Sequence, residues 1–247
     1  MSAEKNKEKN DNKKTYIMEI KANEGKQLNI TVDGVEYMRI PCKTKLVTKD
    51  DDLGDVLDEY TKEVRQPGDM IFVSEKIVAI SQGRAYPISE MNPSWLAKFL
   101  VKFVYKSPHG IGISSPYTMQ LALEDVGLPR LFLGCVAAAV TKPFGIRGAF
   151  YKVCGYRARA IDGPADGVIP PYNGYAKKAP DKPHQVAREM KQRLGNEVII
   201  IDANDIGAHI LGKSSKELND KFLCALFKDN PLGQNSQQTP VAVVRKA

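Results

Sequence analysis

Alternating apolar and polar positions predict that the chain opens with β-structure. Residues 28–32 alternate strictly, Asp33-Gly34 is a turn signal, and residues 35–40 continue the extended pattern. Three later apolar runs have the length of buried strands: 70–73, 197–201 and 240–244.

Apolar residues spaced three to four apart predict amphipathic helices between these strands. One helix follows Asp52 and carries its apolar side chains from Leu53 to Val64, with acidic residues at the positive end of its dipole. Another runs over residues 183–194 and is expected to end at Gly195.

Two more apolar helices are predicted in the middle of the chain. The first starts at Pro93 and carries Trp95, Phe99 and Phe103 at four-residue spacing, with lysines repeating beside them. Such a basic amphipathic helix can lie on a membrane surface. A core helix whose lysines extend to solvent is the favoured interpretation. The second helix, around 131–140, is predicted to be buried.

Composition narrows the class of protein. The chain has 247 residues, of which 43% are hydrophobic, enough for one large domain or two small ones. No apolar run reaches the ~20 residues of a membrane-spanning helix. Residues 1–14 lack the apolar stretch of a signal peptide and are predicted to be a disordered charged tail, leaving 15–247 as the folded domain. These features predict a cytoplasmic protein.

Charge and cysteine content exclude other classes. Four scattered cysteines without a CxxC pair exclude a zinc ribbon and disfavour a disulfide framework. The net charge of +7 suits anionic ligands such as nucleotides, but it does not by itself indicate nucleic-acid binding.

Two acidic turns are candidates for a metal site. Asp162 and Asp166 follow one predicted strand, and Asp202 and Asp205 stand at the end of another. Mg²⁺ or Mn²⁺ bound to nucleotide phosphates needs one or two protein carboxylates, and strand ends are well placed to supply them. The alternative is that these residues only bend the chain, as Asp, Gly and Pro commonly do.

Residues 207–214 match the phosphate-loop pattern GxxxxGK[ST], which makes Lys213 and Ser214 candidate phosphate-binding residues. Acidic residues directly before the pattern, and the single strand predicted after it, count against that fold. Arg157 and Arg159 belong to a basic cluster that is either a phosphate-binding site or a solvated surface.

With these residues identified, a family resemblance emerges. Residues 45–53 and 68–84 are similar to the opening of the coenzyme F-420 gamma-glutamyl ligase family, which pairs an apolar strand after Gly-Asp with a Lys-Ile-Val…Gly-Arg segment. Ala160-Ile-Asp162 resembles that family's metal turn, and residues 198–202 resemble its second apolar strand ending in aspartate. The residues after both aspartates depart from the family pattern, and residues 107–155 are predicted to be a helical insertion.

The resemblance implies an α+β fold, a homodimer, and an enzyme that uses GTP, or ATP, with Mg²⁺ or Mn²⁺. It implies an amide ligase that phosphorylates a carboxylate acceptor and then joins glutamate to it. In that interpretation Asp162 and Asp202 hold the metal, with Asp166 and Asp205 as additional or replacement ligands. Lys76 is a candidate for contact with substrate or phosphate.

Three alternatives remain open at this point. In the first, the protein is a ligase whose acceptor is not a coenzyme F-420 precursor but a folate or another metabolite. In the second, it is a nucleotide-binding regulatory protein of the same fold that has lost ligase chemistry. In the third, it is a phosphate-loop NTPase that uses residues 207–214.

Overall fold

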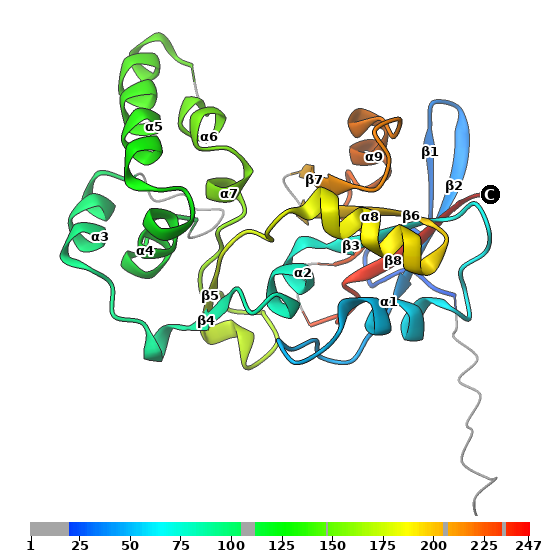
Figure 1. Cartoon of the computed structure of the whole chain (residues 1–247). Helices are drawn as coiled ribbons and strands as arrows, with labels where there is room; N and C mark the ends of the chain where they lie inside the picture. The colour runs from blue at the N-terminus through cyan, green and yellow to red at the C-terminus, as the bar shows by residue number, and fades with distance from the viewer. Residues whose placement is uncertain (1–19, 105–111, 147, 205–206, 234–235) are drawn as a thin grey trace, which may run out of the picture.

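The computed structural model describes residues 20–104, 112–146, 148–204, 207–233 and 236–247. Two regions are visible in Figure 1: a sheet with its covering helices, and a group of helices at one end of the molecule. We call the first the sheet part (20–84 and 178–247) and the second the helical part (91–159). Between them lies a two-stranded antiparallel ribbon of β4 (Ala85–Pro87) and β5 (Tyr175–Lys177). The predicted tail, 1–14, lies outside the described residues.

The sheet part is built on one six-stranded mixed sheet. Its strands are β1 (Asn29–Val32), β2 (Val35–Cys42), β3 (Met70–Ser74), β6 (Glu197–Asn204), β7 (Gly207–Lys213) and β8 (Val241–Lys246). They lie in the order β1-β2-β8-β3-β6-β7, and β3 and β6 are parallel while the other neighbours are antiparallel. The opening hairpin and the three buried strands are confirmed. The combination of helices and mixed sheet confirms the predicted α+β fold.

Alternating side chains of the strands fill two cores, one on each face of the sheet. On β3, Ile71 and Val73 face one side and Phe72 faces the other, as a period of two requires. The first face is covered by α1 (Leu53–Thr61), α2 (Glu75–Ser81) and α8 (Pro183–Leu194), and the second by α9 (Asp220–Leu226). The parallel strands β3 and β6 are therefore covered on both faces, which explains why their sequences are continuously apolar.

The ends of the covering helices follow from local chemistry. The Asp52 side chain accepts a hydrogen bond from the Asp55 amide at 2.8 Å and caps α1, where the acidic residues predicted a helix start. Gly195 adopts φ 79° and ends α8 in the left-handed conformation that glycine tolerates. Both predicted helices are confirmed.

The helical part has a small core of its own. Its elements are α3 (Trp95–Leu100), η2 (Val101–Phe103), α4 (Pro116–Asp125), α5 (Leu128–Thr141), η3 (Lys142–Phe144), α6 (Ala149–Cys154) and α7 (Tyr156–Arg159), with η1 (Ile88–Glu90) before them. Leu121, Leu131 and Cys154 are among the residues buried there. Helices α5 and α6 approach closely at Gly134, where an added Cβ would lie 2.5 Å from the Cys154 sulfur.

The predicted burial of the two middle helices is wrong. Helix α3 forms, but Trp95 is 77% exposed and Phe103 is 74% exposed. Helix α5 also forms, yet only Leu131 and Gly134 of its residues are buried. Among the described residues, other elements cover only part of each helix, so many of its apolar side chains stay exposed. No helix in the described part of the chain is long and apolar enough to cross a membrane.

Candidate functional site

A cleft of about 750 Å³ lies where the sheet part meets the segment that leads out of the helical part. Its walls come from loop 44–47, the start of α2, the 159–169 segment, the end of β6 and the 238–240 loop. Ser74 of β3 pairs with Ile201 of β6, so the carboxyl ends of these two parallel strands meet at the cleft. This is the position at which open sheets with parallel strands commonly bind ligands.

A buried ion pair forms part of the cleft wall. Glu75 and Lys177 are each 5% exposed, and the Lys177 Nζ lies 2.7 Å from the Glu75 Oε1. The same Nζ donates a hydrogen bond to the Ala160 carbonyl at 2.8 Å. Because both charges are removed from water, their pairing is what makes the burial tolerable.

The electrostatics of this pair extend to the nearby aspartates. Burial raises the pKa of Glu75 to about 7; Lys177 opposes that shift, and Asp202 and Asp162 add to it. Burial also raises the pKa of Asp202, while the charge of Lys177 opposes the rise. Burial disfavours the charged form of Lys177, but the surrounding carboxylates outweigh it and raise the pKa of the ammonium. Two lysines and three carboxylates thus interact around one cleft.

Asp162 is held in place by the backbone as well as by a lysine. Its amide donates to the Lys177 carbonyl at 3.1 Å, and its carbonyl accepts from the Lys177 amide at 2.9 Å. Its carboxylate lies 3.5 Å from the Lys76 Nζ, and both side chains remain partly exposed. This pair is therefore accessible to a ligand in the cleft.

The structure brings most of the predicted metal-site residues to this cleft. Asp162, Asp202 and the exposed Asp166 all line it. Asp202 does not stand in a turn, as predicted, because β6 continues to Asn204 and Asp202 pairs with His209 of β7. The fourth predicted residue, Asp205, lies outside the described residues.

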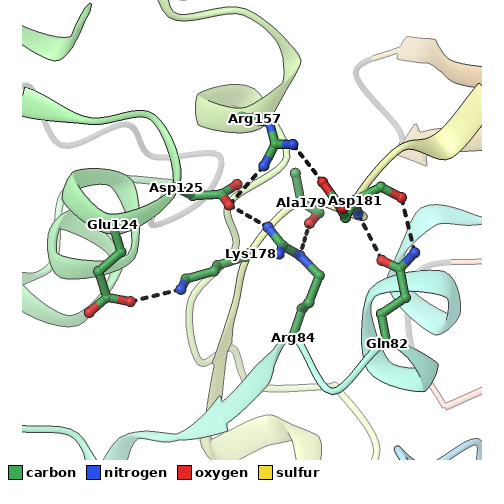
Figure 2. A network of polar contacts seen from close by, with 8 residues as sticks. All are labelled: Gln82, Arg84, Glu124, Asp125, Arg157, Lys178, Ala179 and Asp181. Carbon is green, nitrogen blue, oxygen red and sulfur yellow. Dashed lines mark hydrogen bonds and ion pairs between the residues drawn. The ribbon is translucent and has the colours of Figure 1, made fainter. Parts of the chain in front are cut away.

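The predicted basic residues separate into two groups. Arg159 is exposed and lines the cleft together with Lys76. Arg157 does not line it. Figure 2 shows the Arg157 guanidinium between Asp125 and Asp181, to which it donates hydrogen bonds at 2.9 and 2.6 Å. Arg157 therefore serves the contact between the two parts of the molecule.

The phosphate-loop interpretation of residues 207–214 is wrong. Gly207–Lys213 is the edge strand β7, not a loop, and it forms a hairpin with β6. Gly212 is required for packing, because an added Cβ would lie 2.4 Å from the Pro183 backbone. Lys213 forms an ion pair with Asp220 at 2.7 Å, and the buried Ser214 donates to Glu197. Neither residue lines the cleft.

Two residues of the site were missed by sequence reasoning. Glu75 had a signal, because it is a carboxylate directly after a buried strand within the segment that resembles a ligase. Lys177 had none, since it stands 102 residues away from Glu75 and reaches it only through the β4–β5 ribbon.

Two carboxylates of the cleft, Asp162 and Asp202, are of the chemical type that binds divalent cations. Within the described ranges, no three His, Cys, Asp or Glu side chains are grouped closely enough to form a complete metal site. Magnesium that is bound to nucleotides needs only one or two carboxylates, and water and phosphate supply the other ligands. Asp162 and Asp202 on the walls of one cleft meet that requirement.

Residues 41–149 match the family model F420-0:Gamma-glutamyl ligase. The resemblance predicted from the sequence is confirmed for this segment, and it supports a ligase-like function. The match includes Glu75 and Lys76 and ends before Asp162 and Asp202. No curated protein matches the chain.

The family match also bears on the predicted helical insertion. The matched range ends at residue 149 and so includes most of the 107–155 segment. The described residues of this segment form helices α4 to α6, so its helical character is observed. Its description as an insertion stays a prediction.

Proposed function

We propose that the protein is a GTP-dependent, or ATP-dependent, amide ligase that requires a divalent metal and joins glutamate to a carboxylate acceptor. The supporting observation is that one cleft gathers Asp162, Asp202 and Lys76 from three separate segments of the chain. Its volume of about 750 Å³ is within the range of small-molecule sites. The family match over residues 41–149 supports a ligase-like reaction.

The proposed chemistry has two steps. The acceptor carboxylate attacks the terminal phosphorus of the nucleotide, which forms an acyl phosphate and releases the nucleoside diphosphate. The glutamate amine then attacks the acyl carbon, the amide C–N bond forms, the C–O bond to phosphate breaks, and the amine loses its proton. Phosphate is the second product.

Each cleft residue has a role in this proposal. Asp162 and Asp202 would hold Mg²⁺ or Mn²⁺, with Asp166 and Asp205 as further ligands, and the bound ion would supply positive charge to the phosphates. Lys76 and Arg159 stabilise the negative charge of the transferred phosphoryl group. The Glu75–Lys177 pair is a positioning element, because Lys177 holds Glu75 through its side chain and Asp162 through its backbone. A homodimer is part of the proposal through the family resemblance alone.

The test is turnover with a panel of acceptors. The protein is incubated with GTP or ATP, Mg²⁺ or Mn²⁺, glutamate and either a coenzyme F-420 precursor or a folate. We expect one acceptor to gain the mass of a glutamyl residue. One phosphate should be released from the nucleotide for each product molecule. Asp162→Asn should lower that rate about 100-fold or more, as does the loss of one electrostatic group in an active site.

A second outcome would change the conclusion. Nucleotide binding that requires metal, with no product from any acceptor, would favour the regulatory protein over the ligase. The altered residues after both aspartates are the observation that keeps this second candidate. Absence of nucleotide binding would contradict both.

A further inference from the structure

Exposed large apolar side chains are concentrated in the helical part. Among the described residues they are Trp95, Phe99, Phe103, Leu128, Phe132, Leu133, Val136, Val140, Phe144 and Ile146, with Ile20 as the one outside this region. Single exposed apolar residues are ordinary, but a concentration of this size marks an interaction surface. We call these ten residues the apolar surface.

The charges around the apolar surface are almost all positive. Residues 91–152 contain seven lysines and arginines against two acids, Glu124 and Asp125. The five basic residues described there are all exposed: Lys98, Lys102, Arg130, Lys142 and Lys152. The described surface of the helical part therefore carries both apolar and cationic side chains.

Both acids of this region face the sheet part. Asp125 accepts from Arg84 and from Arg157, and Glu124 forms an ion pair with Lys178 at 2.8 Å. Figure 2 shows these contacts between α4 and the segments that lead into the sheet part. The negative charge of residues 91–152 is thus paired on the inner side. The exposed acid next to this range is Glu90, directly before it.

We propose that the helical part docks on the surface of a lipid bilayer that contains anionic lipids. Trp95, Phe103 and Phe144 enter the interfacial region, and the flanking lysines contact lipid phosphates. Figure 1 shows the helical part at one end of the molecule, beside the sheet and joined to it at the β4–β5 ribbon. The aliphatic stems of the lysines extend from the apolar region to the headgroups.

Charge complementarity favours a bilayer over a second copy of the chain as the occupant. A two-fold interface through the apolar surface would bring the same patch of each copy face to face. Such an interface would enclose Lys98, Lys102 and Lys142 of both copies, and the acids of residues 91–152 are engaged with the sheet part and Arg157 instead. An anionic bilayer satisfies both the apolar and the cationic groups.

The intrinsic fluorescence of the protein gives a direct test. Trp95 is the single tryptophan of the chain, and it stands on the apolar surface. The full chain is mixed with vesicles of phosphatidylcholine alone, or with vesicles that also contain phosphatidylglycerol. We expect Trp95 emission to shift to shorter wavelength, and the protein to sediment, with the anionic vesicles only. Added salt should weaken the binding because it screens the charges.

Matched variants separate the two contributions. Phe103→Ser with Phe144→Ser should lower the vesicle partition coefficient at least about tenfold, since both rings leave the interface. Lys98→Gln with Lys102→Gln should lower it about fivefold for each lysine removed. The control is Lys216→Gln with Lys221→Gln, two exposed lysines of the sheet part, which should leave binding unchanged. Circular dichroism checks that each variant stays folded.

Three outcomes would overturn the proposal. Equal binding to neutral and anionic vesicles would contradict the role of the lysines. Absence of vesicle binding would contradict the docking itself. A dimer in sedimentation equilibrium that Phe103→Ser with Phe144→Ser converts to a monomer, with no vesicle binding by the original protein, would assign the apolar surface to a second copy.

Discussion

The sheet part and the helical part use apolar side chains in opposite ways. In the sheet part, Phe72 is fully buried and its ring stacks on that of Phe227. In the helical part, Phe132 is 64% exposed, although it stands in the regular helix α5. Hydrophobic pattern therefore specifies a helix or strand in both parts, but only in the sheet part does the chain itself provide the contacts that bury it.

The largest expected effect compares these two phenylalanines. Phe72→Ala removes a buried ring and leaves a cavity, so it should lower the free energy of unfolding by about 3–5 kcal/mol. Phe132→Ala removes an exposed ring and should change it by about 0.5 kcal/mol or less. Urea denaturation of both variants measures the difference. Equal losses would show that the helical part buries Phe132 in solution and would break the comparison.

The buried Glu75–Lys177 ion pair is the next test. It is the reverse of the exposed apolar residues of the helical part, because here charged groups are buried inside the sheet part. Lys177→Met leaves Glu75 buried without its partner and should cost about 3 kcal/mol at pH 8. Glu75→Leu in the same chain should recover most of that loss, since no unpaired charge remains.

The same pair predicts a pH dependence. The pKa of Glu75 is raised to about 7 in the folded protein, so the folded state holds the proton more tightly than the unfolded chain. Its favourable contribution is present below the ordinary pKa of glutamate and is lost as pH rises through about 7. Glu75→Gln should remove this fall in unfolding free energy, which is of the order of 1–3 kcal/mol. Parallel urea titrations at pH 5 and pH 8 would detect it, and identical pH profiles would contradict the account.

The contact between the parts depends on Asp125. Its carboxylate is nearly buried and accepts from Arg84 and Arg157 (Figure 2). Asp125→Asn should cost about 1–3 kcal/mol, because two guanidinium groups lose a charged acceptor. Hydrogen exchange should show the helical part less protected while β3 and β6 stay protected. Uniform loss of protection would mean that the two parts unfold as one unit.

The last comparison distinguishes two glycines of β7. Gly212→Ala places a Cβ against the Pro183 backbone and should cost about 1–3 kcal/mol, as overpacking does. Gly207→Ala meets no atom within 4 Å and should be nearly neutral. Thermal unfolding of the pair compares them. A neutral Gly212→Ala would remove the packing reason for that glycine.

Local rules predicted much of the sheet part from sequence. The Asp33-Gly34 turn, the Asp52 cap and Gly195 act on residues within a turn of themselves, so their effects can be read along the chain. The family resemblance implied that Asp162 and Asp202 serve one site, and both line the cleft. The strand predicted before Asp162 is wrong, because Tyr156–Arg159 forms α7 and Asp162 makes only an isolated antiparallel bridge to Lys177.

The remainder depends on long-range placement. Lys177 meets Glu75 across 102 residues of sequence, which no local pattern records. The letters of 207–214 fit a strand as well as a phosphate loop, and pairing with β6 selects the strand. The exposure of Trp95 was not predicted. Apolar residues at helical spacing indicate that one face of a helix packs on something, but they do not say whether the rest of the chain supplies that surface.

The central claim is that the Asp162–Asp202 cleft binds nucleotide together with a metal ion. The direct measurement is the thermal unfolding midpoint with GTP, ATP or GDP, each with and without Mg²⁺ or Mn²⁺, for the original protein, Asp162→Asn and Lys213→Ala. At about 100 times the dissociation constant, the ligand should stabilise the original protein and Lys213→Ala by about 2.7 kcal/mol, and only when metal is present. Asp162→Asn should show no such shift. Metal-independent stabilisation, or a shift lost in Lys213→Ala and kept in Asp162→Asn, would contradict the account.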